Sequence, residues 1–442
     1  MSNLICLGAG IENAPVLSRA RELGHTVIAV DGNPDAPGFT HAAVRVVASC
    51  YHTEQVLPAL GYALNTAGLT PDGVLCAGVD APHVAAAVAS AYPQGARSRG
   101  LPGLTPEAAR LSQDKLAQKT ALHAAGLPVP RFQDVRDGIP YRRYPLVIKP
   151  MDSRGARGVV RLERETYLWD KQYTQAKAAS PTGRVMVEEY LPGPQLSTES
   201  IVVDGRVLFT AVALRNYARL AEFAPHIIED GFDMPYGDTA LVAEVDSVIE
   251  SGCAALGWKT LTVKADLIIH DGRVVILELA ARLSGGFLST HGTALAYHYP
   301  LVDVAIHLAL NEWPKFVVGA PQRLDGATLK PIPDFVCQRY VFPEPGDIGR
   351  RVVNVPRIIF EYPPDGACLL QQISDKPPMT FAKDLIGIRH ATYAVRPGDV
   401  LRPVTDHGAR LGQAIATGST PEQARERAEQ AVKAMRAAII LE

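Results

Sequence analysis

Short apolar runs alternate with stretches of helical spacing over the first hundred residues. Residues 4–7 and 26–30 are apolar runs that predict two strands, and residues 14–23 between them have apolar positions at the spacing of a helix. A third strand is expected at residues 74–77, with an alanine-rich helix after it. This alternation is typical of a parallel sheet covered by helices, and it predicts a Rossmann-like N-terminal domain over residues 1–105.

The middle of the chain has two predicted helices and then a series of strands. Thr105 followed by Pro106 predicts one helix start, and Ser112 is expected to cap a second helix, which carries Lys115 and ends at Gly126. Strands are then expected at residues 146–149, 159–162, 184–190, 200–203 and 207–209, a helix at 241–256, and two more strands within 262–279.

The last part of the chain, from about residue 322, has a strand-rich pattern and ends in a helix. Thr420 is the expected cap of that helix and Pro421 its first residue. Its apolar face consists of Ala424, Ala428, Ala431, Met435 and Ile439. The pattern as a whole predicts an α/β protein with a second domain over residues 106–320, which includes a lid-like segment at 145–213, and a third α+β domain over 321–442.

Composition narrows the class of protein. The 442 residues are 47% hydrophobic and 20% charged, which excludes intrinsic disorder, and the net charge of −2 does not favour nucleic-acid or membrane binding. The six cysteines form no Cys-x-x-Cys pair, so they are expected to be buried thiols in a reducing compartment. Together with an N-terminus that lacks a basic segment, this predicts a cytoplasmic enzyme.

A glycine turn follows the first predicted strand. Gly8 and Gly10 precede a helix, and Asp31 lies near the spacing expected for dinucleotide binding, but Asn13 and Ala14 stand where a third glycine should be. NAD binding is therefore a weak alternative. The start of this helix could still receive a carboxylate or phosphate of a substrate.

A second glycine-containing loop is basic. Lys149 ends a predicted strand, and Ser153, Arg154, Gly155 and Gly158 follow it within residues 152–158. Glycines let backbone N–H groups approach a polyphosphate, and the cationic side chains offset its charge. The alternative is an ordinary surface turn.

Asp266 and Glu278 lie on the two strands around Asp271 and Gly272, twelve residues apart. A three-residue connection would place both carboxylates on the same face of the sheet, whereas a two-residue connection would place them on opposite faces. Two carboxylates on the same face, with substrate phosphates, are typical of a Mg²⁺ site. The alternative is a pair of solvent-facing acids.

Arg282 follows directly, with Ser284, Gly285 and Gly286 after it. If the chain stays extended, Arg282 shares the face of Glu278, and the next three residues could present N–H groups to an oxyanion or a substrate carboxylate. The alternative for Arg282 is a salt bridge to Glu278.

Together these motifs resemble the ATP-grasp superfamily over about three quarters of the chain. The helix with Lys115, the strand ending at Lys149, the glycine loop and the segment Val187–Leu191 resemble the family's nucleotide site in order. The resemblance implies ATP binding by Lys115, Lys149, Ser153, Arg154, Gly155, Gly158, Glu188, Glu189, Leu191, Gln195 and Glu199. It implies metal binding (Mg²⁺ or Mn²⁺) by Asp266 and Glu278, catalysis by Arg282 and Lys149, and substrate binding by Arg282, Ser284, Gly285 and Gly286.

Two positions depart from the family pattern. Gln195 stands where a ribose-binding glutamate is common, with Glu199 as a substitute, and Ala280 stands where an asparagine often binds metal. Arg215, Tyr217, Arg219, His226 and His291 could line the cleft but receive no firm role.

The C-terminal part and the run from Ala280 to Gly286 are most similar to the L-amino-acid ligases. The resemblance implies an ADP-forming carboxylate–amine ligase that joins a small-molecule acid and amine through an acylphosphate, and, since dimers are common in the family, a homodimer. The alternatives are a purine-pathway-like carboxylase or formyl ligase and a non-catalytic ATP-binding regulatory protein.

Overall fold

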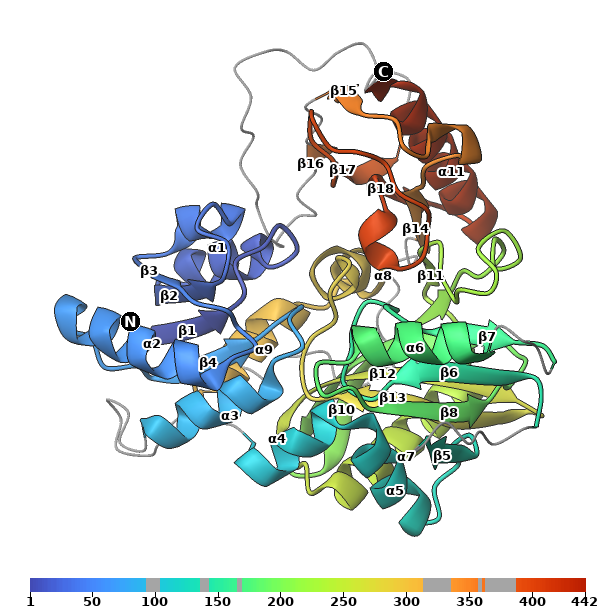
Figure 1. Ribbon diagram of the computed structural model, residues 1–442. Coiled ribbons are helices and arrows are strands. Elements are labelled where there is room, and N and C mark those ends of the chain that lie inside the picture. The colour runs from blue at the N-terminus through green and yellow to red at the C-terminus, as the bar shows by residue number, and fades with distance from the viewer. Residues whose placement is uncertain (93–103, 136–142, 165–168, 313–334, 357–359, 362–386) are drawn as a thin grey trace.

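A computed structural model describes residues 1–92, 104–135, 143–164, 169–312, 335–356, 360–361 and 387–442. Figure 1 shows three parts: the N-terminal part in blue, a central part in green and yellow, and the C-terminal part in orange and red.

The N-terminal part is a parallel sheet with helices around it. Its strands have the order β3-β2-β1-β4, and every pair is parallel. The elements are β1 (Asn3–Leu7), α1 (Ala14–Glu22), β2 (Thr26–Asp31), β3 (Val44–Val47), α2 (Thr53–Ala67), β4 (Gly73–Cys76) and α3 (Pro82–Ala91). The predicted Rossmann-like arrangement is confirmed, and β3 and α2 are additions that the apolar pattern did not single out.

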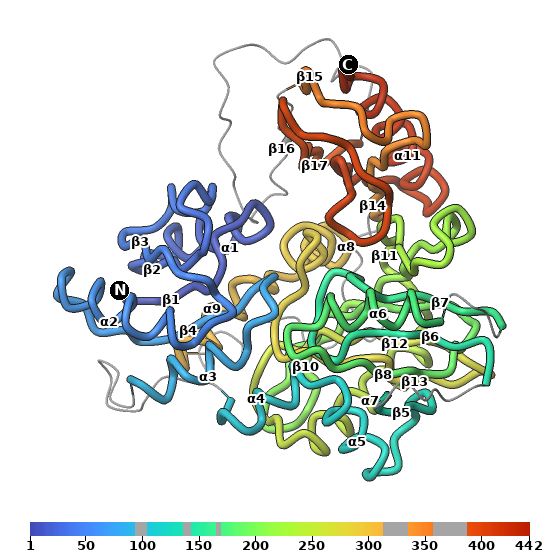
Figure 2. Tube along the Cα trace, viewed as in Figure 1, coloured from blue at the N-terminus to red at the C-terminus, as the bar shows by residue number. Residues whose placement is uncertain are grey.

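Helix α9 (Leu301–Ala309) returns to this sheet from far along the chain (Figure 2). Its buried residues share one core with β1 and α1, and Arg19 on α1 forms a two-pronged ion pair with Asp303, with N–O distances of 2.7 Å. The N-terminal part is therefore completed by residues beyond 300.

A small antiparallel sheet forms one lobe of the central part, in the order β5-β8-β6-β7. Its elements are β5 (Phe132–Asp134), β6 (Leu146–Pro150), β7 (Val160–Leu162), α6 (Trp169–Ala179) and β8 (Val185–Glu189), preceded by α4 (Pro106–Gln113) and α5 (Lys115–Ala124). The core of this lobe is apolar and includes Ile148, Val160, Ala176 and Val187.

One predicted helix cap is wrong. Asp114, not Ser112, caps α5, because its carboxylate accepts the Ala117 N–H at 3.0 Å. The Ser112 hydroxyl instead accepts the N–H of Ala281 at 3.0 Å, so this serine ties α4 to the chain just beyond β13.

The other lobe belongs to a nine-stranded sheet, in the order β13-β12-β9-β10-β11-β14-β18-β17-β16. Its strands are β9 (Gln195–Val203), β10 (Arg206–Arg215), β11 (Phe232–Met234), β12 (Leu261–His270), β13 (Arg273–Ala280), β14 (Phe335–Val341), β16 (Phe360–Glu361), β17 (Ile388–Tyr393) and β18 (Gly412–Gly418). Helix α7 (Thr239–Leu256) packs on the β9–β13 end and α11 (Pro421–Ala437) on the β14–β18 end. The predicted segments 106–320 and 321–442 therefore share one sheet, and segment 145–213 contributes strands to both sheets.

The C-terminal part is strand-rich with one long helix, as expected. Thr420 caps α11 by accepting the Gln423 N–H, and Ala424, Ala428, Ala431 and Met435 form its buried face. Strands β15 (Val352–Asn354) and β19 (Ile440–Leu441) pair with each other beside α11. Helix α8 (Thr293–Tyr297) lies between the central part and the C-terminal part (Figure 1). Within the described ranges, no helix is both long and apolar enough to cross a membrane.

Candidate active site

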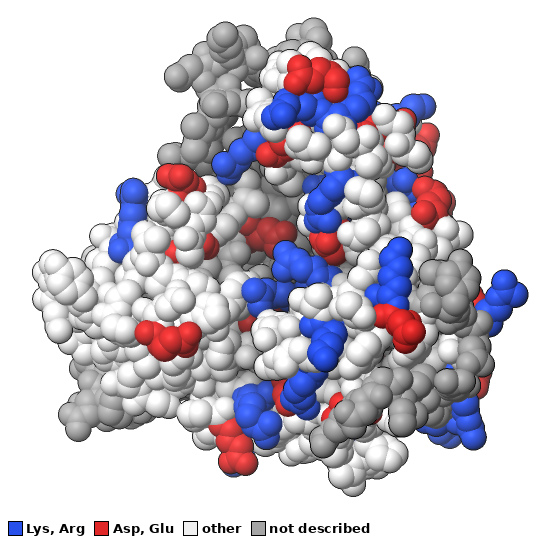
Figure 3. Space-filling view, in the orientation of Figure 1, with Lys and Arg blue, Asp and Glu red and all other residues white. Residues whose placement is uncertain are grey.

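A cavity of about 700 Å³ lies where the three parts meet. Figure 3 shows the hollow, in which both acidic and basic side chains are visible. Most residues singled out from the sequence line it: Lys115, Lys149, Ser153, Arg154, Gly155, Glu188, Glu189, Leu191, Gln195, Asp266, Glu278, Arg282, Ser284, Gly285 and Gly286. The structure thus brings residues from 115 to 286 into one site.

Two of the sequence-predicted residues do not line the cavity. Gly158 lies where the glycine loop meets α6, with a φ of +72°, and a Cβ there would come within 2.9 Å of the Ala179 side chain. Glu199 is fully buried behind the cavity wall. These two positions therefore support the site from behind.

Glu188 is held between two lysines. Its carboxylate oxygens lie 3.1 Å from Lys119 Nζ and 2.6 Å from Lys149 Nζ. Burial works against the charged carboxylate, but the two ammonium groups outweigh it and lower the pKa of Glu188. Burial lowers the pKa of Lys119 to about 8. The sequence reasoning missed Lys119, although its position one helical turn after Lys115 was a usable signal.

Lys115 connects the glycine loop to a predicted metal ligand. Its Nζ lies 3.2 Å from Glu278 Oε1 and donates to the backbone carbonyl of Ser153 at 3.1 Å. Burial alone would lower the pKa of Lys115, but the Glu278 carboxylate outweighs burial and raises it. The ammonium group is therefore held charged at the cavity wall.

Asp266 and Glu278 lie directly opposite each other on β12 and β13, so both carboxylates are on one face. The expected three-residue connection between the strands is wrong, because Asp271 and Gly272 form a two-residue turn between the paired residues His270 and Arg273. A bulge at Leu277 adds one residue to β13 and restores the common face.

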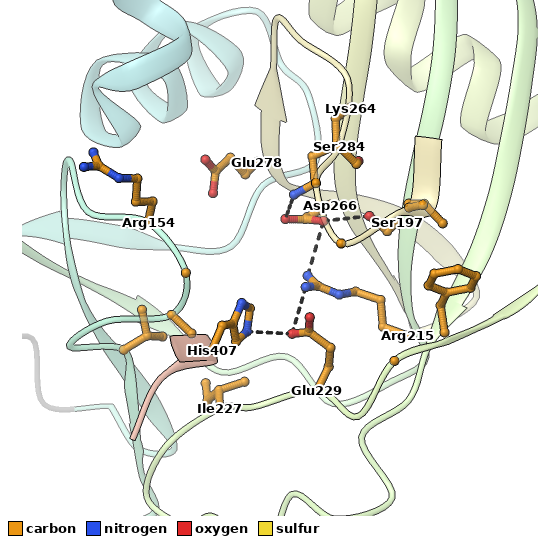
Figure 4. A pocket seen from close by; sticks show the side chains of 18 of the residues that line it. Arg154, Ser197, Arg215, Ile227, Glu229, Lys264, Asp266, Glu278, Ser284 and His407 are labelled. Carbon is orange, nitrogen blue, oxygen red and sulfur yellow. Dashed lines mark hydrogen bonds and ion pairs between the residues drawn. The ribbon is translucent and has the colours of Figure 1, made fainter. Parts of the chain in front are cut away.

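Asp266 is surrounded by donors (Figure 4). Its carboxylate pairs with Lys264, lies 3.3 Å from the Arg215 guanidinium, and accepts the Ser197 hydroxyl at 3.2 Å. Burial raises the pKa of Asp266, but the neighbouring cations dominate and lower it to about 2.

The two opposed carboxylates fit a divalent cation in chemistry and placement, since hard cations prefer oxygen ligands. Within the described part of the chain, no third His, Cys, Asp or Glu joins them to form a cluster that could hold a metal. A metal ion there would therefore need oxygen ligands from phosphate or water, which is the arrangement that Mg²⁺ adopts on nucleotides.

A second charged cluster was not predicted. Glu229 lies 2.9 Å from Arg215 and 2.9 Å from His407 Nε2 (Figure 4). It also lies 2.7 Å from Arg410. Burial opposes its charge, but Arg215, His407 and Arg410 together outweigh burial and hold the pKa of Glu229 well below its usual range. Since His407 and Arg410 lie far along the sequence in a polar loop, no local pattern pointed to them. The cluster ties the C-terminal part to the central sheet.

The remaining candidates separate into two groups. Arg215 and Tyr217 line the cavity, whereas Arg219, His226 and His291 do not. His291 packs edge-on against Phe287, and burial lowers its pKa to about 4, as expected for a neutral core histidine.

Arg282 does not pair with Glu278. Its Nε lies 3.2 Å from Asp80, which comes from the N-terminal part, and a further N–H donates to the Leu283 carbonyl at 3.0 Å. Burial opposes the Asp80 carboxylate, but Arg282 and Lys115 outweigh it and lower the pKa of Asp80. The arginine therefore links two parts of the molecule at the cavity.

Two of the three expected oxyanion donors already have partners. The Ser284 N–H donates to Glu199 at 2.9 Å, and the Gly286 N–H donates to Glu12 at 2.8 Å. The expectation that the Ser284–Gly286 segment offers these N–H groups to a substrate is therefore wrong for this conformation, because buried or cavity-lining carboxylates accept them.

The basic glycine loop lines the cavity and contacts both neighbouring parts of the molecule. The Arg154 guanidinium stacks over the Tyr51 ring at 3.3 Å from its centroid, and the Gly155 carbonyl accepts the His407 N–H at 3.1 Å. Tyr51 belongs to the N-terminal part and His407 to the C-terminal part. The alternative of an isolated surface turn does not hold, since the loop contacts both neighbours.

Two models of protein families match parts of this chain. A model of the ATP-grasp domain matches residues 112–286, and one of the L-amino acid ligase C-terminal domain 2 matches residues 379–439. The cyanophycin synthetase of Crocosphaera subtropica is 30% identical over 190 residues, which are 40% of this chain and 21% of that protein. This chain thus spans about a fifth of that relative.

Solved structures show the same fold along the whole chain. The L-amino acid ligase of Bacillus licheniformis matches with a TM-score of 0.72 at 16% identity, over 100% of this chain and 98% of that one. The phosphoribosylglycinamide synthetase of Anaerococcus prevotii matches with a TM-score of 0.67 at 17% identity, over 100% of this chain and 99% of the other. The expected architecture of an N-terminal Rossmann-like part, a two-lobed core and a β-rich C-terminal part is confirmed.

Proposed function

Because the chain carries an ATP-grasp domain, we propose that it is an ATP-dependent ligase that joins a carboxylate to an amine and releases ADP and phosphate. The acid is proposed to be an amino acid, in line with the match to an L-amino acid ligase domain at the C-terminus. The observation that carries the proposal is the arrangement of Asp266 and Glu278 on one face of the sheet, beside Lys115, in the cavity that Lys149 and Arg282 also line.

The first step forms an acylphosphate. A carboxylate oxygen of the acid attacks the γ-phosphorus of ATP, the bond from that phosphorus to the β–γ bridging oxygen breaks, and ADP leaves. Such a reaction requires little covalent chemistry of the protein, so positioning and charge neutralisation dominate. Lys115 and Lys149 are proposed to neutralise the phosphates, and the glycine loop, through Ser153, Arg154 and Gly155, to cover them.

The second step forms the amide. The neutral amine attacks the acyl carbon, and the C–O bond to phosphate breaks as the tetrahedral oxyanion collapses. The proton that the nitrogen loses goes to the departing phosphate. The guanidinium of Arg282 is held at the cavity by Asp80 and is proposed to stabilise that oxyanion. The backbone N–H groups of Ser284 and Gly286 are engaged elsewhere, so Arg282 carries this role in the proposal.

Asp266 and Glu278 are the proposed ligands of Mg²⁺ or Mn²⁺, which would neutralise phosphate charge when bound. In the structure, Lys264 and Lys115 neutralise the two carboxylates. A bound metal ion would replace these lysines as the partner of the carboxylates. Ala280 offers no ligand, so the rest of the coordination is assigned to phosphate and water.

The adenine is assigned to the end of β8 and the chain after it. Glu189 and Leu191 line the cavity there, as does Gln195 at the start of β9. Because Glu188 is engaged by Lys119 and Lys149, its proposed part is to set the position of Lys149 as well as to face the base. Glu199 is not retained as a ribose ligand, because it is buried behind the wall.

Three further features remain proposals. Five cysteines of the described chain are buried free thiols, which supports a reducing, cytoplasmic location, and Cys368 lies outside the described residues. The domain limits 1–105, 106–320 and 321–442 are kept as the proposed division, with α9 packing back on the first. A homodimer is proposed from the resemblance alone.

Trapping with hydroxylamine tests the function. Mg-ATP, hydroxylamine and a panel of amino acids and small carboxylates are incubated with the protein, and hydroxamate, ADP and AMP are measured together. The proposal expects hydroxamate with ADP for at least one amino acid. AMP formation would overturn the acylphosphate mechanism. Turnover only with a ribonucleotide amine would favour a purine-type ligase, and ATP binding without any product would favour a regulatory protein.

A further inference from the structure

Glu12 is an acidic residue of the N-terminal part that lines the active-site cavity. It lies directly before Asn13 and α1, in the segment that follows the first glycine turn. Its carboxylate accepts the N–H of Gly286, which lies beyond Arg282 in the central part. This contact places Glu12 at the substrate end of the cavity, beside the segment that follows the proposed catalytic arginine.

Glu12 differs from the other acids of the cavity in its charge balance. The other lining carboxylates each have a cationic partner: Asp80 with Arg282, Glu188 with Lys149, Glu189 with Arg131, Glu229 with Arg410, Asp266 with Lys264, and Glu278 with Lys115. Among the residues that the structure describes, Glu12 has no ion pair. A carboxylate that faces a cavity without a cation is a favourable site for a cationic ligand group.

Two glycines let side chains of the other parts come close to the backbone beside Glu12. A Cβ on Gly285 would come within 2.5 Å of Glu12 Oε2, and a Cβ on Gly286 would come within 3.0 Å of the Tyr340 hydroxyl. Gly286 also has a φ of +64°. The two glycines therefore let a carboxylate from the N-terminal part and a phenol from the C-terminal part approach the same point.

A phosphate is a poor occupant of this corner. The Ala9 N–H, in the turn where a phosphate would seek donors, is occupied by Asp31 at 2.7 Å. An unpaired Glu12 would further repel an anion. The carboxylate of Glu12, which has no ion pair among the described residues, favours a cation at this corner instead.

We propose that Glu12 binds the ammonium group of the amino-acid substrate whose carboxylate is activated near Arg282, and that it is the residue by which the site selects amino acids over acids without an amino group. This inference rests on the proposed ligase function and adds the residue that determines the substrate class. Glu12 positions substrate and takes no part in the bond changes.

The test compares Glu12→Gln with wild type on matched acid pairs. The pairs are L-alanine with propanoate, L-phenylalanine with 3-phenylpropanoate, and L-glutamate with glutarate, in the hydroxylamine assay. Glutamine keeps the shape and an oxygen that can accept the Gly286 N–H, so the contact between the parts persists. Glu54→Gln is the control, because Glu54 is 74% exposed on α2 and away from the cavity.

We expect wild type to prefer the amino acid of at least one pair. In Glu12→Gln, the KM for that amino acid should rise about 10- to 100-fold, the loss expected for a hydrogen bond to a charged group. The KM for its partner without the amino group and the KM for ATP should stay within about twofold of wild type.

Four results would overturn the inference. Equal losses for both members of a pair would show a structural role for Glu12, and an unchanged KM would show that it does not bind the ammonium. Wild-type turnover of acids without an amino group as fast as of amino acids would leave the ligase function standing and remove the role of Glu12. Absence of hydroxamate from wild type on the whole panel would instead count against the ligase function, and Glu12's role would fall with it.

Discussion

The two ends of the cavity are built in different ways. The proposed nucleotide end takes its side chains mainly from regular elements of the central part: Lys115 from α5, Lys149 and Glu188 from two strands of the small sheet, and Asp266 and Glu278 from paired strands of the large one. The substrate end is assembled from loops and strand ends of all three parts, with Glu12, Ser284, Gly286, Tyr340 and Arg410. In the proposed function, rigid elements thus hold the phosphates, whereas contacts between the parts of the molecule determine which substrate fits.

Substitution of Lys149, at the proposed nucleotide end, has the largest expected effect on activity. In Lys149→Met, a charge that neutralises the phosphates is lost and Glu188 keeps only Lys119, so kcat for ADP release should fall about 10²- to 10³-fold. The exposed Lys177→Met on α6 is the matched control and should keep wild-type activity. Steady-state kinetics with ATP measure the effect, and a fall below threefold would contradict the assignment.

Arg282 lies at the boundary between the two ends. Arg282→Ala should lower kcat about 10²-fold while the Kd for ATP, measured by calorimetry, changes little, because the oxyanion forms only during acyl transfer. Asp80→Asn removes the ion pair but keeps the guanidinium. It should therefore retain more activity than Arg282→Ala, and a large loss of ATP binding in Arg282→Ala would disprove the role.

The residues of the proposed nucleotide end, which lie on regular elements, could be predicted from sequence far better than those of the substrate end, which lie mainly on loops. Period-two patterns and single residues such as Lys149 and Asp266 mark positions that the local chain already determines. The bulge at Leu277 was invisible in the pattern, and it alone places Glu278 on the face of Asp266. Contacts such as Glu12 with Gly286 join residues far apart in sequence, so no local spacing encodes them.

Lys119 and His407 show the same difference at single residues. Lys119 is one helical turn from Lys115 and could have been found from the helix pattern, whereas His407 reaches Glu229 from a loop beyond β17. The sequence therefore predicted the fold and part of the cavity wall. It left out the side chains that the C-terminal part adds, such as His407 and Arg410.

A variant of Glu199 tests the buried contact behind the substrate end, where this residue accepts the Ser284 N–H. Burial raises its pKa from 4.5 to about 7, so the folded state keeps a proton that the unfolded state releases. The stability that this proton provides is full below about pH 4.5 and is lost as the pH rises through 7. Over that range the loss should be on the order of 3 kcal/mol.

Glu199→Gln stays neutral at every pH and should remove this dependence. The change in unfolding midpoint between pH 5 and pH 8 is compared for the variant and wild type, by fluorescence during a urea titration. Wild type should lose more stability than the variant as the pH rises. Equal losses in both proteins would contradict a buried, protonated Glu199.

The variant Gly285→Ala has the smallest expected effect. It tests whether the substrate end of the cavity can be changed without changing the nucleotide end. A methyl group in Gly285→Ala would press on Glu12 Oε2 at 2.5 Å, which the flexible end of that side chain can relieve by a small shift. The KM for the amino acid should rise roughly three- to tenfold, the loss of one good hydrogen bond. The KM for ATP should not change, and a parallel rise in both values would mean that the two ends are not separable.

The central claim is that a substrate carboxylate attacks the γ-phosphate of ATP in this cavity. Its most direct test uses a substrate acid labelled with ¹⁸O in the carboxylate, identified first by trapping, with a suitable amine and Mg-ATP. Mass spectrometry of the released inorganic phosphate should show one ¹⁸O atom per turnover, transferred from the acid when the C–O bond of the acylphosphate breaks. Label recovered in AMP, or phosphate without label while amide accumulates, would contradict the account.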